Sequence, residues 1–258
     1  FNIDPNEISK KITSKTGAIL IVHMYGLACK IDEIKKIAKE KKLFLIEDCA
    51  QCHFGKYKGK HVGLFGDLSA YSFYPGKNLG GIGDGGAVIS NNNKFTKRIK
   101  MLSRNGGLKK NHHQIIGYNS RLDSINAEFL NIKLRYIIKW NKKRKKIAER
   151  YNSKLKGLKN KIKLPIIPKN ADHTFHLFVI KARNRNKLKK YLKQKKIETF
   201  IHYPSILPKI IPYKKQNKNF KFSNSINNEN EILSLPIYPY MPYSHVDKIC
   251  KEIYNFYN

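Results

Sequence analysis

The stretch LSAYSFYPGKNLGGIGDGGAVIS, from Leu68 to Ser90, decides the fold of this chain. Its apolar, aromatic-rich first part predicts a buried strand over Leu68 to Tyr74, which Pro75-Gly76 ends. Lys77 follows at once, and five glycines then fall between Gly80 and Gly86. A single lysine between a strand end and a loop that lets backbone approach a ligand is a way to present a reactive amine. A hairpin turn with a solvated lysine fits the same letters, and only the rest of the chain can decide between the two.

Two apolar runs upstream predict a βαβ unit. Ala18 to Val22 and Leu43 to Ile46 read as buried strands, and between them Ile31, Ile34 and Ala38 fall on one face of a helix. A strand, a helix and a strand in this order predict a mostly parallel sheet, with function gathered at the carboxyl ends of its strands. Asp48 falls at such an end.

The second half of the chain predicts a long helix followed by a smaller domain. After a strand at 87–90 and a helix at 93–104, a three-or-four spacing of apolar residues from Leu122 to Leu155 predicts one helix buried along one stripe. Two prolines in Leu164-Pro-Ile-Ile-Pro168 fix an extended connector. We therefore expect a large domain over 1–163 and a small α+β domain over 164–258. The elements expected in the latter are strands at 174–181 and 197–201, helices ending at 195 and starting at 245, and a long loop with one short helix at 205–230.

The composition fits one large domain or a large and a small one, and it points to no partner. The 258 residues are 41% apolar, and the formal charge is +34. Such a charge raises the alternative of nucleic-acid binding. However, the lysines are scattered through every predicted helix and loop, and the one dense cluster, KKRKK at 142–146, lies inside a helical pattern that favours a solvated face. We do not expect a nucleic-acid partner.

The cysteines and the apolar runs predict a reduced, cytoplasmic protein without a membrane segment. There are four cysteines and no secretory signal, and the longest aliphatic run, Ala18 to Val22, is too short to span a bilayer. Cys49 and Cys52 form a C-x-x-C, but no second pair or ligand-spaced histidine cluster completes a zinc site. We expect no metal.

One constellation of residue types suggests pyridoxal phosphate chemistry. Gly81 to Gly86 matches G-x-G-x-x-G, but a lysine loop precedes it and a strand follows it, whereas a dinucleotide site needs a strand before and a helix after. Pyridoxal phosphate enzymes need a reactive lysine, a carboxylate that keeps the pyridine nitrogen protonated, and neutral donors for the phosphate. Lys77, Asp48 and Ser72 could supply these. A solvated lysine, a helix-capping aspartate and a buried hydroxyl would explain the same three residues.

A series of motifs in order along the chain resembles the DegT/DnrJ/EryC1/StrS family of pyridoxal phosphate-dependent sugar aminotransferases. The motifs cover essentially the whole chain: VHMYG (22–26), IEDCAQCHFGKYKGK (46–60), GDLSAYSFYPGKNLGGIGDGGAV (66–88), GYNSRLDSINAEFL (117–130), HTFHLFVI (173–180), IHYP (201–204) and LSLPIYPYM (233–241). The resemblance implies an aspartate aminotransferase-type α/β fold (fold type I), with a mixed, mostly parallel sheet flanked by helices, in a homodimer with shared active sites.

The resemblance also implies roles for individual residues. Lys77 would bond to the cofactor and move the proton, and Asp48 would pair with the pyridine nitrogen. The remaining assignments are Gln51 near the ring hydroxyl, Ser72 at the phosphate, Asn119 at the phosphate of the neighbouring subunit's cofactor, and His202 and Tyr203 near the sugar.

The reaction implied by the resemblance moves an amino group from glutamate to a keto sugar nucleotide. YPGKNLG followed by GDGG is more similar to members that aminate carbon three of a dTDP- or UDP-linked hexose than to those acting at carbon four. The chain departs from the family in two places. The expected segment before FNIDP, with its Gly-Ser/Thr turn, is missing, and Ser205 to Lys209 lacks the expected histidine and glutamine. We therefore expect an N-terminally incomplete member, with a truncated non-catalytic remnant acting as a partner subunit as the alternative.

Overall fold

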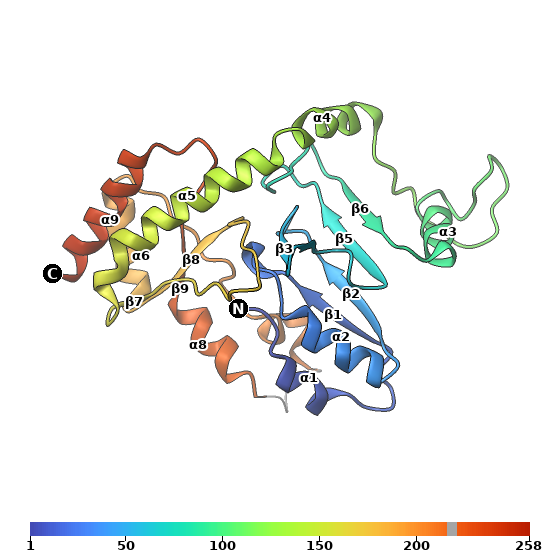
Figure 1. Ribbon diagram of the computed structural model, residues 1–258, viewed down its shortest axis with the longest axis horizontal. Helices are drawn as coiled ribbons and strands as arrows, with labels where there is room; N and C mark the ends of the chain where they lie inside the picture. The colour runs from blue at the N-terminus through green and yellow to red at the C-terminus, as the bar shows by residue number, and fades with distance from the viewer. Residues whose placement is uncertain (216–220) are drawn as a thin grey trace. The chain divides into compact units, whose positions relative to one another are not determined.

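The computed structural model describes residues 1–215 and 221–258, which form two compact units (Figure 1). Unit 1 consists of Phe1–Lys142 and Ile167–His176, and unit 2 of Lys143–Ile166 and Leu177–Asn258. A domain boundary at Leu164 stays a prediction.

Unit 1 is built on a four-stranded, mostly parallel sheet in the order β1-β2-β5-β6 (Figure 1). Its strands are β1 (Ala18–Val22), β2 (Phe44–Asp48), β5 (Leu68–Ser72) and β6 (Gly86–Ile89). β1 pairs in parallel with β2, and β2 with β5, whereas β6 runs antiparallel to β5. The βαβ unit and the mostly parallel sheet predicted from the sequence are therefore confirmed.

One face of this sheet holds the core of unit 1. Ile19, Ile21 and Leu45 point to it and pack with Ile31 and Ile34 of the helix α2. The other elements of the unit are α1 (Pro5–Lys11), η1 (Met24–Gly26), α2 (Ile31–Glu40), the hairpin β3 (Lys56–Tyr57) and β4 (Lys60–His61), α3 (Asn93–Leu102) and α4 (Ser124–Leu134). Successive side chains of a strand point to opposite faces of the sheet. Because the strands are apolar along most of their length, the face opposite to the core also carries apolar side chains, and Leu20, Phe44 and Val88 on it are exposed.

Unit 2 is built on a three-stranded antiparallel sheet, β7-β8-β9. The strands are β7 (Ile162–Lys163), β8 (Phe178–Ala182) and β9 (Ile232–Leu235), and the helices are α6 (Arg185–Gln194), α7 (Ile211–Lys214), α8 (Ser223–Glu231) and α9 (Tyr243–Tyr257), with short 3-10 turns η2 (Lys156–Leu158) and η3 (Leu207–Lys209). The β9 side chains are all buried, and Leu188 and Leu192 of α6 are buried with them. This matches the smaller α+β part that the sequence predicts.

The long helix predicted over Leu122 to Leu155 is wrong as one element. The structure has α4 followed by α5 (Ile137–Leu155), with a turn between them. At this turn the Tyr136 amide donates to the Lys133 carbonyl, three residues back, which tightens the backbone. The predicted single buried stripe also fails, because Ile125 is 75% exposed and Ile132 is 49% exposed.

Two predicted strands and one loop also differ from the structure. The strand predicted at 174–181 begins only at Phe178, because Phe175 has φ 48° in the left-handed region. The one predicted at 197–201 is reduced to an isolated bridge between Phe200 and Ser234. The loop predicted at 205–230 contains η3, α7 and most of α8 rather than one short helix, and its residues 216–220 lie outside the described part.

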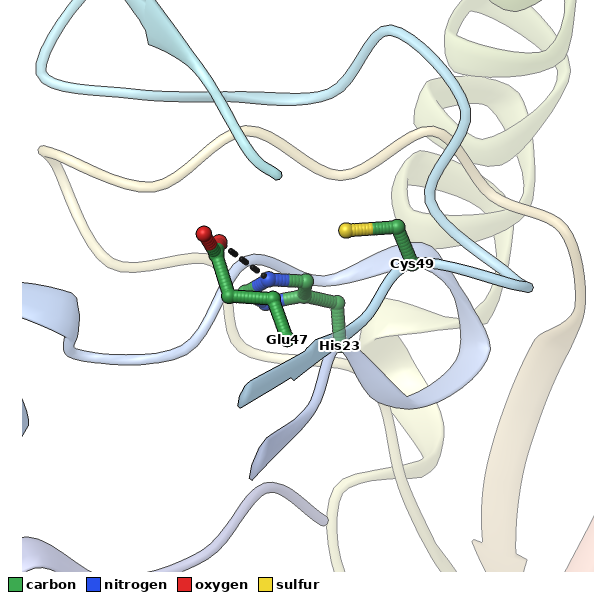
Figure 2. A group of neighbouring side chains, drawn as sticks. All are labelled: His23, Glu47 and Cys49. Carbon is green, nitrogen blue, oxygen red and sulfur yellow. Dashed lines mark hydrogen bonds and ion pairs between the residues drawn. The ribbon is translucent and has the colours of Figure 1, made fainter. Parts of the chain in front are cut away.

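A buried carboxylate, Glu47 of β2, anchors the loop that precedes β5. Its Oε1 accepts hydrogen bonds from the amides of Phe65 (2.8 Å) and Gly66 (2.6 Å), and its Oε2 accepts from the Gly63 amide (2.8 Å) and from His23 Nε2 (3.1 Å). Figure 2 shows the imidazole lying against this carboxylate. Both side chains are fully buried. Burial by itself raises the pKa of Glu47, but these donors outweigh it and hold that pKa below its ordinary value.

We predict that Glu47→Ala lowers the free energy of unfolding by roughly 3–5 kcal/mol, because it leaves three amides and His23 buried without their acceptor. Glu47→Gln keeps the shape but loses the charge, so its loss should be smaller. The pKa of Glu47 is lower in the folded protein than the value of about 4.3 expected in the unfolded chain. The stability that the charge contributes is therefore fully present above the unfolded-state pKa and is lost as the pH falls through the folded-state pKa. Urea unfolding at several pH values measures this, with exposed Glu40→Gln as the control. Equal stability of Glu47→Gln and wild type at neutral pH would contradict it.

Candidate active site

The carboxyl ends of the parallel strands bring two predicted site residues to one edge of the sheet in unit 1. Asp48 ends β2, and Ser72 ends β5. The register pairs Asp48 with Ala70, two residues before Ser72. Because side chains alternate along a strand, Asp48 and Ser72 project from the same face. This is the face opposite to the α2 core.

Lys77 follows this edge in the turn after β5. Its backbone amide donates to the Tyr74 carbonyl (2.9 Å), and its side chain is half-buried. Burial lowers the pKa of the Lys77 amine below its ordinary value, and the attraction of Asp48 opposes that fall. The amine therefore lies within electrostatic reach of Asp48 and is partly removed from water.

Two of the glycines after Lys77 lie where a side chain would not fit, while the predicted approach of this loop to a ligand stays a prediction. A Cβ on Gly80 would lie 2.3 Å from the Pro75 carbonyl oxygen, and one on Gly81 would lie 2.1 Å from Oδ1 of Asn126 in α4. Asn126 Oδ1 also accepts from the Ile82 amide (3.1 Å). The loop thus closes on itself and on α4.

Gln51 is buried in the loop after Asp48. Its Oε1 accepts from the Tyr25 amide (2.6 Å), and Tyr25 has φ 59°, a left-handed conformation that is uncommon for a bulky residue. The Thr174 hydroxyl donates to the Gln51 carbonyl (3.3 Å). Asp48 itself is oriented by the Ala50 amide, which donates to its Oδ1 (2.9 Å). The loop that carries Asp48 and Gln51 is therefore held from several sides.

His53 is a residue of this region that the sequence analysis missed. It is only 1% exposed, and neither ring nitrogen makes a hydrogen bond of standard geometry among the described residues. Burial lowers its pKa to about 4; the nearby Ser72 carbonyl opposes this and the Lys77 charge adds to it. A buried imidazole with a lowered pKa thus lies against the rings of Tyr71 and Phe73 at the end of β5. The only sequence signal was its place in the QCHFG run.

The other three predicted site residues belong to other segments of the chain. Asn119 is exposed between α3 and α4, and its Oδ1 accepts from Arg121 Nε (3.2 Å). His202 and Tyr203 belong to unit 2, where His202 Nδ1 lies 2.8 Å from the Ser234 hydroxyl and Tyr203 is 52% exposed. Their roles, like those of Lys77, Asp48, Gln51 and Ser72, stay predictions.

Within residues 1–215 and 221–258, one group of three potential metal ligands lies close together: His23, Glu47 and Cys49 (Figure 2). Its donor atoms are already engaged, because His23 Nδ1 accepts from the Cys29 amide (3.1 Å), Nε2 faces Glu47, and both Glu47 oxygens accept amides. Burial raises the pKa of the Cys49 thiol, which favours the protonated form over the thiolate that binds metals. These contacts describe a structural anchor.

The described part of the chain contains no helix with the length and apolarity needed to cross a membrane.

Comparison with known proteins identifies the family of this chain. A dTDP-3-amino-3,6-dideoxy-alpha-D-galactopyranose transaminase of Aneurinibacillus thermoaerophilus is 42% identical over 98% of this chain and 69% of its own length. A pleiotropic regulatory protein of Geobacillus stearothermophilus is 36% identical over 100% of the chain and 70% of its own length.

Among solved structures, S. venezuelae DesV superposes with a TM-score of 0.93 at 34% identity, covering 99% of this chain and 69% of that one. This likeness confirms the predicted aminotransferase fold of type I. The model of the DegT/DnrJ/EryC1/StrS aminotransferase family matches residues 1–254. The protein is therefore a member of the DegT/DnrJ/EryC1/StrS aminotransferase family.

Proposed function

We propose that the protein is a pyridoxal phosphate-dependent aminotransferase that moves an amino group from glutamate to a keto sugar nucleotide, at carbon three of a dTDP- or UDP-linked hexose. The observation that carries the proposal is the half-buried Lys77 amine, with its lowered pKa, within reach of Asp48 at the carboxyl edge of a parallel sheet. The relative named as a dTDP-3-amino sugar transaminase supports the substrate class and the carbon.

The residues present fit the proposed cofactor by the chemistry of their donor set. A partly desolvated amine, a carboxylate and a hydroxyl follow or end two adjacent strands, and Asp48 and Ser72 project from one face. Lys77 would hold the cofactor, Asp48 its pyridine nitrogen and Ser72 its phosphate, with Gln51 near its ring hydroxyl. When bound, pyridoxal phosphate supplies an electron sink for the carbanion formed at the amino-bearing carbon.

Lys77 would act through its Nζ as nucleophile and as the group that moves a proton. Both roles need the neutral amine, and burial increases its fraction at a given pH by lowering the pKa. Asp48 works against this by attracting the ammonium form. Engaging the Asp48 charge with a cationic ring nitrogen would weaken that attraction, so we expect Lys77 to become a better base when the cofactor is bound.

We predict that Lys77→Ala abolishes the visible absorbance of the protein-bound cofactor and lowers transamination at least about 10³-fold, because neither role of the amine can be replaced. Absorbance spectra and single-turnover assays with glutamate measure the two effects. Lys133→Ala is the matched control, since Lys133 is also partly buried with a lowered pKa but donates to the Gly80 carbonyl instead. Retention of the absorbance band in Lys77→Ala would rule out its assigned role.

We predict that Asp48→Asn lowers the pKa of Lys77 further in the cofactor-free protein, because the substitution removes the attraction that raises it. The rate of Lys77 acylation as a function of pH, followed by peptide mass spectrometry, gives this pKa directly. Asp84→Asn, at an exposed position of the glycine loop, should leave it unchanged. A pKa that rises or stays constant in Asp48→Asn would mean that the two side chains do not interact.

A homodimer with shared active sites is part of the proposal. Unit 1 exposes large apolar side chains along α4 and the segment before it: Ile116 (93%), Tyr118 (69%), Ile125 (75%) and Ile132 (49%). Exposed apolar surface of this kind is typical of protein interfaces. Asn119 lies among these residues, which supports its predicted reach toward a neighbouring subunit.

We predict that Ile125→Asp shifts the protein from dimer to monomer, because a carboxylate at the interface would lose its water. Analytical ultracentrifugation over a range of protein concentrations measures the shift. Ile166→Asp, at a position 84% exposed outside unit 1, serves as the control and should leave the association unchanged. The interface assignment fails if wild type is monomeric or if both variants behave alike.

Incubation of the purified protein with glutamate and a panel of keto sugar nucleotides would identify the substrate and test the proposed function as a whole. A non-catalytic role as a partner subunit is the alternative, and the relative named as a pleiotropic regulatory protein gives a reason to keep it. Amino sugar formed with one nucleotide sugar supports the enzyme. Absence of both cofactor binding and turnover would support the alternative.

A further inference from the structure

The residue after Lys77 is the centre of a buried polar network in unit 1. Asn78 is 6% exposed, and its Nδ2 donates both to Oδ1 of Asn141 (3.0 Å) and to the Thr174 carbonyl (3.2 Å). Its Oδ1 lies 3.2 Å from Nδ1 of His176 and accepts from it in the tautomer with a proton on that nitrogen. Both N–H groups and the oxygen of this carboxamide thus have partners.

The same network reaches the loop that follows β2. Asn141 Nδ2 donates to the His53 carbonyl (2.9 Å), and the Thr174 hydroxyl donates to the Gln51 carbonyl (3.3 Å). Asn78 is therefore linked, through Asn141 on one side and Thr174 on the other, to the loop that carries Asp48 and Gln51. The link joins residues that lie 63 and 96 positions apart in the chain.

Asparagine is the side chain that suits this position. Two donors and one acceptor are required, so aspartate would lack the donors and alanine would lack all three groups. An unmade hydrogen bond is costly in a buried position, and a network with missing members loses its rigidity. Asn78 directly follows Lys77 in the chain. A movement of the Asn78 backbone would therefore also move the backbone that carries the Lys77 amine.

We propose that Asn78 is a positioning residue, which holds the Lys77 amine at a fixed place relative to Asp48 and Gln51 through its hydrogen bonds to Asn141 and Thr174. The proposal rests on the proposed function for its effect on turnover, but the geometry it asserts exists in the cofactor-free protein. A displacement of about 1 Å at a reacting group can cost about 100-fold in rate, so small movements matter.

The test measures Lys77 itself before any turnover. In cofactor-free Asn78→Ala, the pH dependence of Lys77 acylation should show a pKa that moves back up toward its ordinary value, because a loosened loop lets water reach the amine. With cofactor and substrates, kcat should fall about tenfold or more while KM for glutamate changes little. A loss of stability alone would change neither the pKa nor the ratio of kcat to KM in the folded protein.

Asn141→Ala provides a second variant that breaks the network from α5 and leaves Asn78 in place. It should move the Lys77 pKa in the same direction, and the double variant should add little to either single one, since both remove the same link. Asn131→Ala, at an exposed site on α4, is the control. If Asn78→Ala does not fold, Asn141→Ala decides alone.

An unchanged Lys77 pKa in folded Asn78→Ala and Asn141→Ala overturns the positioning role. Failure of the proposed function would give a different pattern, with wild type lacking cofactor absorbance and turnover while the Lys77 pKa still moves in the variants.

Discussion

The site in unit 1 depends on how far the Lys77 amine is withdrawn from water while a carboxylate stays close to it. Burial favours the neutral amine, and Asp48 favours the charged one, so the balance between them sets what Lys77 can do. This balance needs both the loop after β5, which carries Lys77, and the end of β2, which carries Asp48. The parallel register of β2 and β5 brings both to one edge, and the Asn78 network keeps them there.

The two adjacent carboxylates of β2 have different roles, Glu47 in the stability of the fold and Asp48 in the proposed chemistry. Glu47 points into the core, where three amides and His23 occupy its oxygens, and it fixes the turn that leads into β5. Asp48 points to the other face, at the strand end, where the Ala50 amide donates to its Oδ1. The alternation of side chains along a strand is enough to give neighbours of similar chemistry these separate tasks.

The sequence predicted the elements whose signal is local. β1, α2, β2 and β5 follow from apolar runs and helical spacing, and Lys77 was found because a proline, a glycine and several loop glycines surround it. The break between α4 and α5 was not predictable from spacing, since neither proline nor glycine marks it. The strand expected from Thr174 fails because Phe175 adopts a left-handed backbone. The hydrogen bonds among Asn78, Asn141 and Thr174 could not be predicted, because they join distant parts of the chain.

The role assigned to Lys77 is tested directly by finding which lysine holds the cofactor. The protein is incubated with pyridoxal phosphate, reduced with borohydride and digested, and mass spectrometry of the peptides locates the cofactor. The chain has 44 lysines, so non-specific labelling would be spread widely. We expect the label on Lys77, with the other lysines labelled only at background level. A label absent from Lys77, or concentrated on another lysine, would contradict the assignment of this site.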